Sequence, residues 1–208
     1  VDAHIRVIKP KDKKIILMAT KESHALGDIL VRHANGELDA QIECVIANHD
    51  TLETFVRRFD IPFFHVPADD MTREEHEEHV MTLISEFEFD YIVLAKYMRI
   101  LTPDFVKAYP EKIINIHHSF LPAFIGANPY KQAFERGVKI IGATAHFVTD
   151  DLDEGPIIAQ DVIPVNHRLS WRDMQRAGRD GEKIVLSRAL ALVLHDRVFV
   201  NGNKTVIF

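Results

Sequence analysis

The chain has 208 residues, of which 47% are hydrophobic and 27% charged, the composition of an ordinary water-soluble globular protein. Its formal net charge of −6 argues against a nucleic-acid partner, because phosphate binding requires clustered Lys and Arg. No apolar run approaches the roughly 20 residues of a membrane span, and the N-terminus lacks a signal-peptide pattern, so no membrane partner is expected. The single cysteine, Cys44, lies in an apolar run, which predicts a buried thiol and a cytoplasmic location.

The first half of the chain alternates continuous apolar runs with segments of helical periodicity. Strands are expected at 14–18, 42–48, 63–66, 91–95 and 113–117. Helices are expected at 20–35, along the stripe Leu52, Phe55, Val56 and Phe59, and from the Thr72–Glu75 capping box to residue 87. Because strands covered by helices on both faces are apolar throughout, this half predicts an open, doubly wound, mostly parallel α/β sheet. Ligands of such sheets bind beyond the carboxyl ends of the strands.

The second half has a different pattern. Residues 141–149 and 156–165 predict longer strands, and residues 170–195 predict one long amphipathic helix. In the C-terminal segment 198–208, Asn201-Gly202 separates two β-rich runs, which predicts a β-hairpin. Because we find no linker, repeat or low-complexity segment, we expect residues 1–208 to form a single domain.

Two runs of charge are expected to be solvated rather than functional. They are Lys11, Lys13 and Lys14 before the first strand, and Glu74, Glu75, Glu77 and Glu78 on one helix. His76 and His79 have the i, i+3 spacing of a metal site, but they lie among these glutamates. A solvated face is therefore favoured, and no metal site is expected.

Two segments combine residue types that are suited to catalysis. In 113–122, IINIHHSFLP, a buried strand ends with Asn115 and His117 two positions apart, so both side chains leave the same face. In 145–156, AHFVTDDLDEGP, three aspartates precede a Gly-Pro turn. Taken alone, the first segment is better explained by hydrogen bonds of Asn115 and His117 to the backbone, and the second by an ordinary acidic turn. His118, adjacent to His117, is expected on the opposite face, where it either lines the water side of a pocket or packs structurally.

The chain resembles the folate-dependent formyltransferase and formyl-hydrolase superfamily in three motifs and in their order. The motifs are N-I-H, S-F-L-P and H-F-V-T-x-x-L-D-x-G-P. The match runs from Tyr97 to Pro156, with weaker agreement back to Lys14. The resemblance implies a Rossmann-like formyltransferase fold with Asn115, His117 and Asp153 as reacting residues. The substrate-binding residues that it implies are Met98, Arg99, Ile100, Leu101, His146, Val148, Thr149, Asp150 and Asp151.

The implied substrate, 10-formyltetrahydrofolate, carries a formamide on N10, a weak electrophile with a poor leaving group. Attack on it places negative charge on the formyl oxygen, which Asn115 and a protonated His117 are expected to stabilise. The loss of one such donor typically costs ~100- to 1000-fold in rate. Asp153 is expected to hold the attacking water, to accept its proton and to raise the pKa of His117. No cofactor is expected.

A closer resemblance, to the formyltetrahydrofolate deformylases, covers nearly the whole chain and implies water as the acceptor. It rests on residues 117–120, 126–130, 179–182 and 202–208. In residues 19–28, ATKESHALGD, the side chains of Lys21, Glu22 and His24 stand where glycinamide ribonucleotide formyltransferases carry a glycine-rich loop for the acceptor's phosphate. Such a transferase and a catalytically silent folate-binding domain are the alternatives.

The same resemblance has implications beyond the site. These deformylases usually carry an N-terminal ACT regulatory domain, so the start on Val1 rather than Met predicts that an upstream domain is missing. A homo-oligomer and a role in one-carbon metabolism and purine biosynthesis are implied in the same way. Ala25 departs from the pattern, which has Cys after the residue matching His24.

Overall fold

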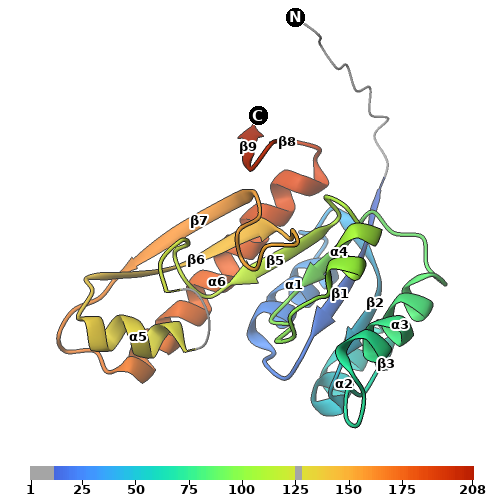
Figure 1. Ribbon diagram of the computed structural model, residues 1–208, viewed down its shortest axis with the longest axis horizontal. Helices are drawn as coiled ribbons and strands as arrows, with labels where there is room; N and C mark the ends of the chain where they lie inside the picture. Colours follow the sequence, from blue (N-terminus) through green and yellow to red (C-terminus); the bar gives the residue numbers. More distant parts are fainter. Residues whose placement is uncertain (1–11, 125–127) are drawn as a thin grey trace, which may run out of the picture.

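The computed structural model describes residues 12–124 and 128–208, so the expectations for Lys11 and for residues 126 and 127 lie outside the described residues. The strands of the main sheet are β1 (Lys13–Ala19), β2 (Ala40–Ala47), β3 (Phe63–His65), β4 (Tyr91–Leu94), β5 (Ile113–His117), β6 (Ile140–Phe147) and β7 (Ile157–Pro164). Their order is β3-β2-β1-β4-β5-β6-β7 (Figure 1). The strands from β3 to β5 are parallel, whereas β6 is antiparallel to both neighbours. The expected mostly parallel sheet is confirmed.

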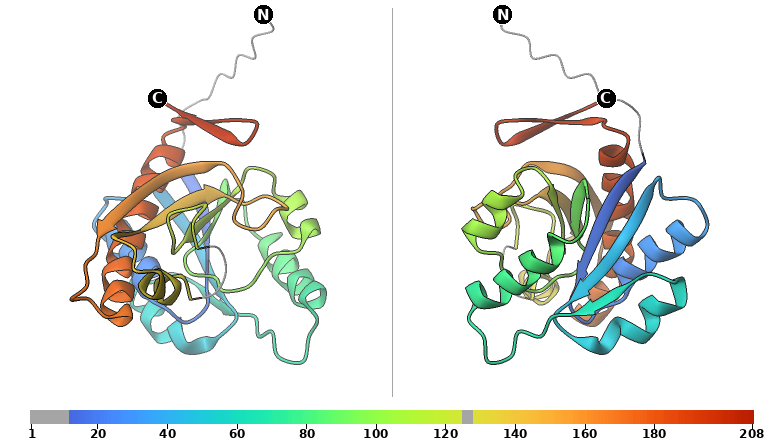
Figure 2. Two further views of the ribbon diagram at one scale, coloured as in Figure 1. Left: turned by 60° about the vertical axis from the view of Figure 1, so that its left-hand side comes forward. Right: turned by 90° about the vertical axis from the view of Figure 1, so that its right-hand side faces the viewer.

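Helices cover both faces of this sheet (Figure 2). They are α1 (His24–Ala34), α2 (Glu53–Val56), α3 (Arg73–Ile84), α4 (Pro103–Ala108), α5 (Pro129–Arg136) and α6 (Trp171–Leu194). One apolar core lies between the sheet and α1, α2 and α6, and a second lies between the sheet and α3 and α4. A smaller cluster packs α5 against β6 and the first turns of α6. This is the doubly wound arrangement that the sequence predicts.

Alternation along the strands explains why the buried runs are apolar throughout, because successive side chains point to opposite faces. In β1, Ile15 and Leu17 enter the core on the α1 side, whereas Ile16 and Met18 enter the core on the α3 side. Cys44 of β2 is completely buried on that second side, and burial raises the pKa of its thiol to about 12. The expected buried, unreactive cysteine is confirmed.

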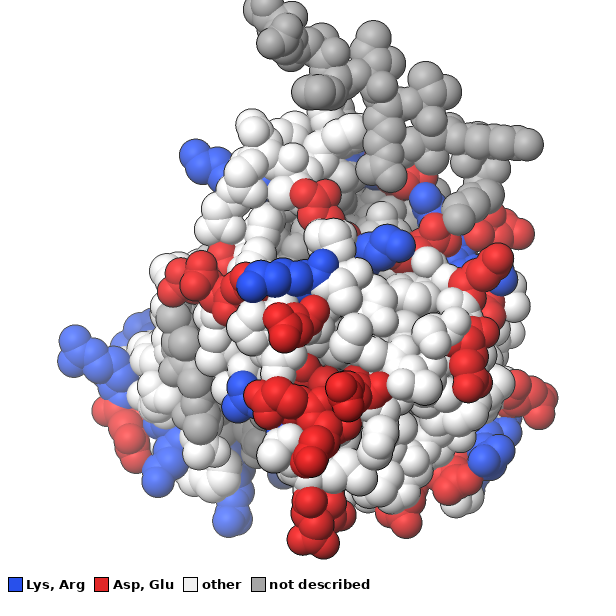
Figure 3. Space-filling view, turned by 45° about the vertical axis from the view of Figure 1, so that its right-hand side comes forward, with Lys and Arg blue, Asp and Glu red and all other residues white. Residues whose placement is uncertain are grey.

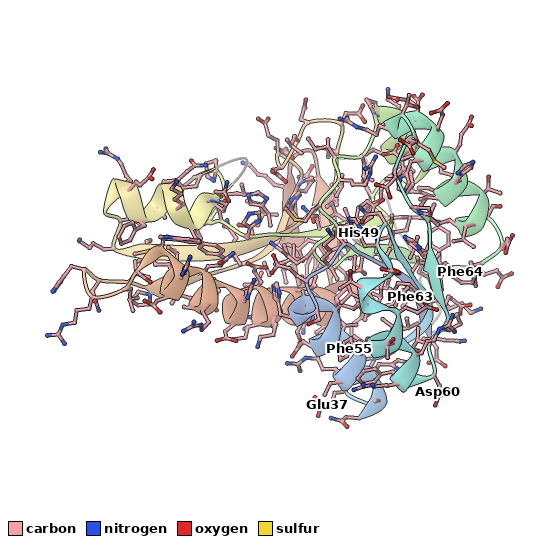
Figure 4. The ribbon with its side chains drawn as sticks, turned by 90° about the horizontal axis from the view of Figure 1, so that it is seen from below. Glu37, His49, Phe55, Asp60, Phe63 and Phe64 are labelled. Carbon is pink, nitrogen blue, oxygen red and sulfur yellow. The ribbon has the colours of Figure 1, made fainter. Side chains whose placement is uncertain are left out.

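The outer strand β3 shows the same alternation. Phe63 belongs to the core on the α1 side, and its neighbour Phe64 packs on the other side, where its ring meets the edge of Phe87 at 5.8 Å. Figure 4 labels both side chains together with Phe55 of α2, whose ring contacts Phe59 at 5.5 Å. Because a shift by one residue would exchange the two faces, these rings fix the register of a short strand.

The long C-terminal helix and the hairpin are also confirmed. Ser170 and Asp173 form a capping box at the start of α6. Strands β8 (Val198–Asn201) and β9 (Lys204–Ile207) pair around Gly202, whose φ of +61° suits the turn. The hairpin lies beyond the end of α6 (Figure 1), and the Thr205 hydroxyl donates a hydrogen bond to the carbonyl of Ile157 (2.5 Å).

Some element boundaries differ from the sequence expectation for local reasons. The helix expected at 20–35 begins at His24, because residues 20–23 connect it to β1. The helix expected at the Leu52–Phe59 stripe is the short α2 flanked by two 3₁₀ turns, and Asp60 ends it with a φ of +57°. Helices α4 and α5 were not expected, although each begins with a proline, which is favoured in the first turn of a helix.

The expectation of solvated side chains is wrong for Glu77 and Lys13 of the charged runs, and for His76. Glu77 is only 5% exposed and accepts hydrogen bonds from the backbone N–H (3.0 and 3.1 Å) and the hydroxyl of Thr102, the residue that caps α4. His76 is buried and hydrogen-bonded to the carbonyl of Val66 (3.0 Å). Lys13 is buried as well, and its ammonium group pairs with Asp196 (2.8 Å). These partners lie far away or in loops, so the local charge pattern does not reveal them.

The surface is otherwise rich in acidic groups. On the face shown in Figure 3, Asp and Glu side chains form several clusters, and Lys and Arg side chains are scattered between them. Within residues 12–124 and 128–208, no helix is both long enough and apolar enough to cross a membrane.

The loop between β6 and β7 leads to the first prediction. A side chain at Gly155 would collide with the carbonyl of Phe147, next to the hydrogen bond from Phe147 N–H to Pro156 O (2.9 Å) that closes the loop. We therefore expect Gly155→Ala to lower the free energy of unfolding by about 3 kcal/mol, the upper part of the usual range for overpacking. Urea unfolding checks this. The matched control is Gly27→Ala in α1, where the added carbon meets only the far end of Phe55 and stability should be nearly unchanged.

Candidate active site

A cavity of about 460 Å³ opens where β4 and β5 end, at the edge of the sheet where the fold rule places ligands. Asn115, His117, His146 and Asp153 all line it. Asn115 and His117 leave the same face of β5, as the sequence predicts. Asn115 lies directly opposite His146 in the β5–β6 register, and its amide nitrogen is 3.4 Å from His146 Nε2.

The β6–β7 loop brings Asp153 to the two histidines. One carboxylate oxygen lies 3.3 Å from His117 Nδ1, and the other lies 3.7 Å from His146 Nε2. The backbone at Asp153 is left-handed, with a φ of +57°. Burial by itself raises the pKa of Asp153, but the hydrogen bonds with His117 and His146 outweigh it and hold the pKa well below its usual range. Asp153 is therefore a carboxylate at neutral pH.

The carbonyl of Phe147 fixes one ring proton of the site. It lies 2.8 Å from His146 Nδ1, which must therefore donate to it, while His146 Nε2 faces both the Asn115 amide nitrogen and the Asp153 carboxylate. His117 Nδ1 faces Asp153, while His117 Nε2 is buried and has no hydrogen-bond partner among the described residues. A buried polar atom without a partner is costly, and a ligand in the cavity can satisfy it.

The structure places eight of the nine residues expected to bind substrate at this cavity. They are Met98, Arg99, Ile100, Leu101, His146, Val148, Thr149 and Asp150. Asp151 does not line the cavity; its carbonyl accepts a hydrogen bond from the Thr149 hydroxyl (3.3 Å) within the loop. Met98, Ile100 and Leu152 are about half exposed and provide apolar surface beside the reacting residues.

The segment that carries Met98 and Ile100 is held at both ends. Met98 N–H donates to the hydroxyl of Thr20 (2.9 Å), and the buried carboxylate of Glu77 holds Thr102. The backbone of this segment is thereby fixed before a ligand binds.

Sequence reasoning missed a network of charged and hydroxyl groups, all of whose members except His24 line the same cavity. We call it the Glu182 network; its members are Glu22, His24, Lys96, Tyr130, Arg179 and Glu182. Glu182 is 1% exposed and contacts His24 Nε2 (2.8 Å), Lys96 Nζ (3.4 Å) and the Tyr130 hydroxyl (2.6 Å). The sequence signals were the similarity of residues 126–130 and 179–182 to deformylases and the side chains of Glu22 and His24 in place of a glycine-rich loop, but nothing showed that these segments meet.

His24 bridges two carboxylates in this network. Its Nδ1 lies 3.3 Å from Glu22 and its Nε2 lies 2.8 Å from Glu182. Burial lowers the pKa of His24, but the two hydrogen bonds outweigh it and raise the pKa above the ordinary value of 6.5. The hydrogen bond with His24 in turn lowers the pKa of Glu22 to about 2. Arg179 also pairs with Glu22 (3.0 Å).

The expectation that His118 faces away from His117 is wrong. The two rings lie 5.1 Å apart and line the same cavity, because β5 ends at His117 and the chain turns there. The His118 ring also lies 6.0 Å from that of Tyr130. Burial, together with the nearby ammonium group of Lys96, lowers the pKa of His118 to about 4, so its ring is neutral at physiological pH.

Within the described part of the chain, no group of three or more His, Cys, Asp and Glu side chains is arranged to hold a metal ion.

The bridged histidine leads to a prediction about pH. Because the pKa of His24 is higher in the folded than in the unfolded state, its protonated form stabilises the fold. This contribution is full below pH 6.5 and disappears as the pH rises through the folded-state value. We expect the excess stability of the wild type over His24→Gln, measured by urea unfolding between pH 5.5 and 9, to decline with increasing pH. Parallel curves for the two proteins would contradict the bridging role.

Comparisons with known proteins agree with this geometry. The formyl transferase family model matches residues 13–190. Formyltetrahydrofolate deformylase of Escherichia coli (strain K12) is 59% identical over 207 residues, which are 99% of this chain and 74% of the E. coli protein.

Among solved structures, too, a deformylase is more similar to this chain than a transformylase. The formyltetrahydrofolate deformylase of Pseudomonas syringae pv. tomato has a TM-score of 0.93 at 52% identity, covering 95% of this chain and 66% of that one. Glycinamide ribonucleotide transformylase 1 of Symbiobacterium toebii has a TM-score of 0.88 at 30% identity, covering 94% of both chains. The fold is thus shared with both groups, whereas the identity is much higher to the deformylases. The chain belongs to the formyl transferase family and, within it, to the formyltetrahydrofolate deformylases.

Proposed function

We propose that the protein hydrolyses 10-formyltetrahydrofolate to formate and tetrahydrofolate, with water as the second reactant and without a cofactor. The observation that carries the proposal is the cluster of Asn115, His117 and Asp153 at one cavity, beside the apolar surface of Met98 and Ile100. That surface suits a flat pterin ring, and the fixed backbone of the same segment suits hydrogen bonds to its edge. The loop at residues 148–151 would close over the ring.

Asn115 and His117 would activate the formyl group. The Asn115 amide has a second N–H beyond the one directed at His146, and His117 Nε2 is buried without a partner. Both can donate to the formyl oxygen when His117 is protonated. Fixed donors of this kind stabilise the negative charge that develops during attack, at no cost of reorganisation.

Asp153 would hold the attacking water and accept its proton. A carboxylate with a strongly lowered pKa is a weak base in the resting enzyme, but the lowering comes from its two histidine partners. When His117 gives its proton to the departing N10, its positive charge disappears and Asp153 becomes more basic. Acid and base would therefore act together: the C–O bond forms, the C–N10 bond breaks, N10 receives a proton, and formate leaves with one proton released to solvent.

Water rather than an amine as acceptor is supported by the segment that leads from β1 into α1. Glu22 lines the cavity and its low pKa keeps it negatively charged, which disfavours the phosphate of a ribonucleotide. His24 is occupied by Glu182, whereas Lys21 does not line the cavity. The rival function, glycinamide ribonucleotide formyltransferase, is further disfavoured by the lower identity to those enzymes.

We also propose a cytoplasmic homo-oligomer that acts in one-carbon metabolism and purine biosynthesis. The buried, unpaired Cys44 suits a reducing compartment. The exposed Phe199, Val206, Ile207 and Phe208 on the C-terminal hairpin supply apolar surface for self-association.

The role of Asp153 can be tested by Asp153→Asn. The amide preserves size and polarity but cannot accept the water's proton, so we expect formate release to fall at least ~100-fold while folate binding persists. Formate production and the binding of tetrahydrofolate by calorimetry provide the two measurements. Glu154→Gln, which changes an exposed carboxylate next to Asp153 that does not line the cavity, is the matched control. Retention of more than about a tenth of wild-type turnover would contradict the assignment of the base.

The acceptor can be tested directly by adding glycinamide ribonucleotide at millimolar concentration to the reaction. We expect formate to equal tetrahydrofolate at every time point, with neither the rate nor the formate yield changed. A fall in formate matched by formylated ribonucleotide would make the protein a transferase instead.

A further inference from the structure

The centre of the Glu182 network is a carboxylate that the proposed chemistry does not use. Glu182 lies on α6 and is 1% exposed. Its Oε2 faces His24 from α1 and Lys96 from the segment after β4, and its Oε1 accepts the hydroxyl of Tyr130 from α5. One buried side chain thus joins four parts of the fold at the edge of the cavity.

The contact between Tyr130 and Glu182 depends on a glycine one turn earlier on α6. A side chain at Gly178 would overlap the Tyr130 ring. The ring therefore fits against α6 only because residue 178 is a glycine. Burial and the charge of Glu182 raise the pKa of Tyr130, which therefore remains a phenol and a donor. The contact thus combines close steric fit, between Gly178 and the Tyr130 ring, with a hydrogen bond from Tyr130 to Glu182.

The network lies next to the reacting residues. The His118 ring is 5.1 Å from that of His117 and 6.0 Å from that of Tyr130, so it connects the two groups. With His24 protonated, the positive charges of His24, Lys96 and Arg179 face the negative charges of Glu22 and Glu182. These groups pair with one another, so a second substrate would have to break ion pairs in order to bind there.

We propose that Glu182 sets the acceptor specificity of the enzyme. By holding His24, Lys96 and Tyr130 in place, it keeps the space beside the formyl carbon closed to amine nucleophiles and open to water. This inference rests on the proposed hydrolysis. An amine that enters would form a C–N bond with the formyl carbon while the C–N10 bond breaks, and its proton would pass to N10, giving a formylated amine in place of formate.

Hydroxylamine is a suitable probe because it is small, uncharged at neutral pH and forms formohydroxamate. Each protein is incubated with 10-formyltetrahydrofolate and hydroxylamine, and tetrahydrofolate, formate and formohydroxamate are measured after subtraction of the reaction without protein. For the wild type we expect formate to account for nearly all the tetrahydrofolate formed. For Glu182→Gln, which keeps the shape but removes the charge, we expect the ratio of formohydroxamate to formate to rise at least tenfold.

Two further variants make the test specific. Tyr130→Phe keeps the ring but removes one hydrogen bond to Glu182, and we expect a smaller rise in the ratio. Asp180→Asn changes an exposed carboxylate on the same helix, and the ratio should stay at the wild-type value. If Glu182→Gln does not fold, as judged by circular dichroism, Tyr130→Phe carries the comparison.

The ratio separates specificity from structure, because a merely structural defect lowers both products in parallel and leaves the ratio unchanged. An unchanged ratio in the folded variants, with tetrahydrofolate still formed, would overturn this inference and leave the proposed function intact. Free production of formohydroxamate by the wild type would overturn it as well. Failure of the wild type to form tetrahydrofolate at all would contradict the proposed function itself.

Discussion

Asn115 and His146 face each other across the first antiparallel pair of a sheet whose other half is parallel, and the geometry of the site depends on that register. The register pairs Phe147, the last residue of β6, with Ile114 near the start of β5, and the loop that follows β6 returns to His117 with Asp153. Gly155 lets the loop pass close to the backbone of Phe147, and Asp153 arrives in a left-handed conformation between two imidazoles. A slip by one residue in β5–β6 pairing would turn Asn115 and His117 to the other face.

The site contains two buried carboxylates with similar surroundings and different access. Asp153 lies between His117 and His146, and Glu182 lies between His24 and Lys96. Both have a pKa lowered by their cationic or hydrogen-bonding partners in spite of burial. Both carboxylates line the cavity, but the Asp153 side chain is 9% exposed, whereas that of Glu182 is 1% exposed and its second oxygen is bound by Tyr130. The two carboxylates therefore differ in exposure to the cavity rather than in the direction of their pKa shift. We assign the more exposed one, Asp153, to proton transfer and the other, Glu182, to positioning its neighbours.

The sequence predicts those features that depend on near neighbours. Continuous apolar runs indicate β1, β4 and β5, and capping residues mark α3 and α6, because these signals lie within a few residues of the elements that they describe. The placement of Asn115, His117 and Asp153 at one cavity was expected from motifs whose order resembles a known superfamily.

What the sequence does not predict depends on partners far apart in the chain. Glu182 and His24 are 158 positions apart, and nothing in either segment indicates that they meet. Glu77 lies within an acidic run typical of a solvated helix, yet Thr102, 25 positions later, draws it into the interior. A local sequence pattern predicts only the usual environment of a charged residue. One hydrogen-bond donor far away in the chain is enough to bury a side chain that the pattern places in solvent.

The complementary volumes of Gly178 and Tyr130 have a consequence for how this sequence can diverge. A larger residue at 178 displaces the ring, and a smaller residue at 130 leaves a void beside a buried carboxylate, so neither position can drift alone without disturbing Glu182. The two positions are therefore expected to vary together. Loss of the glycine on this helix would disturb the cavity wall at Tyr130 and Glu182, so the composition of a helix far along the chain bears on the choice of second substrate that we propose.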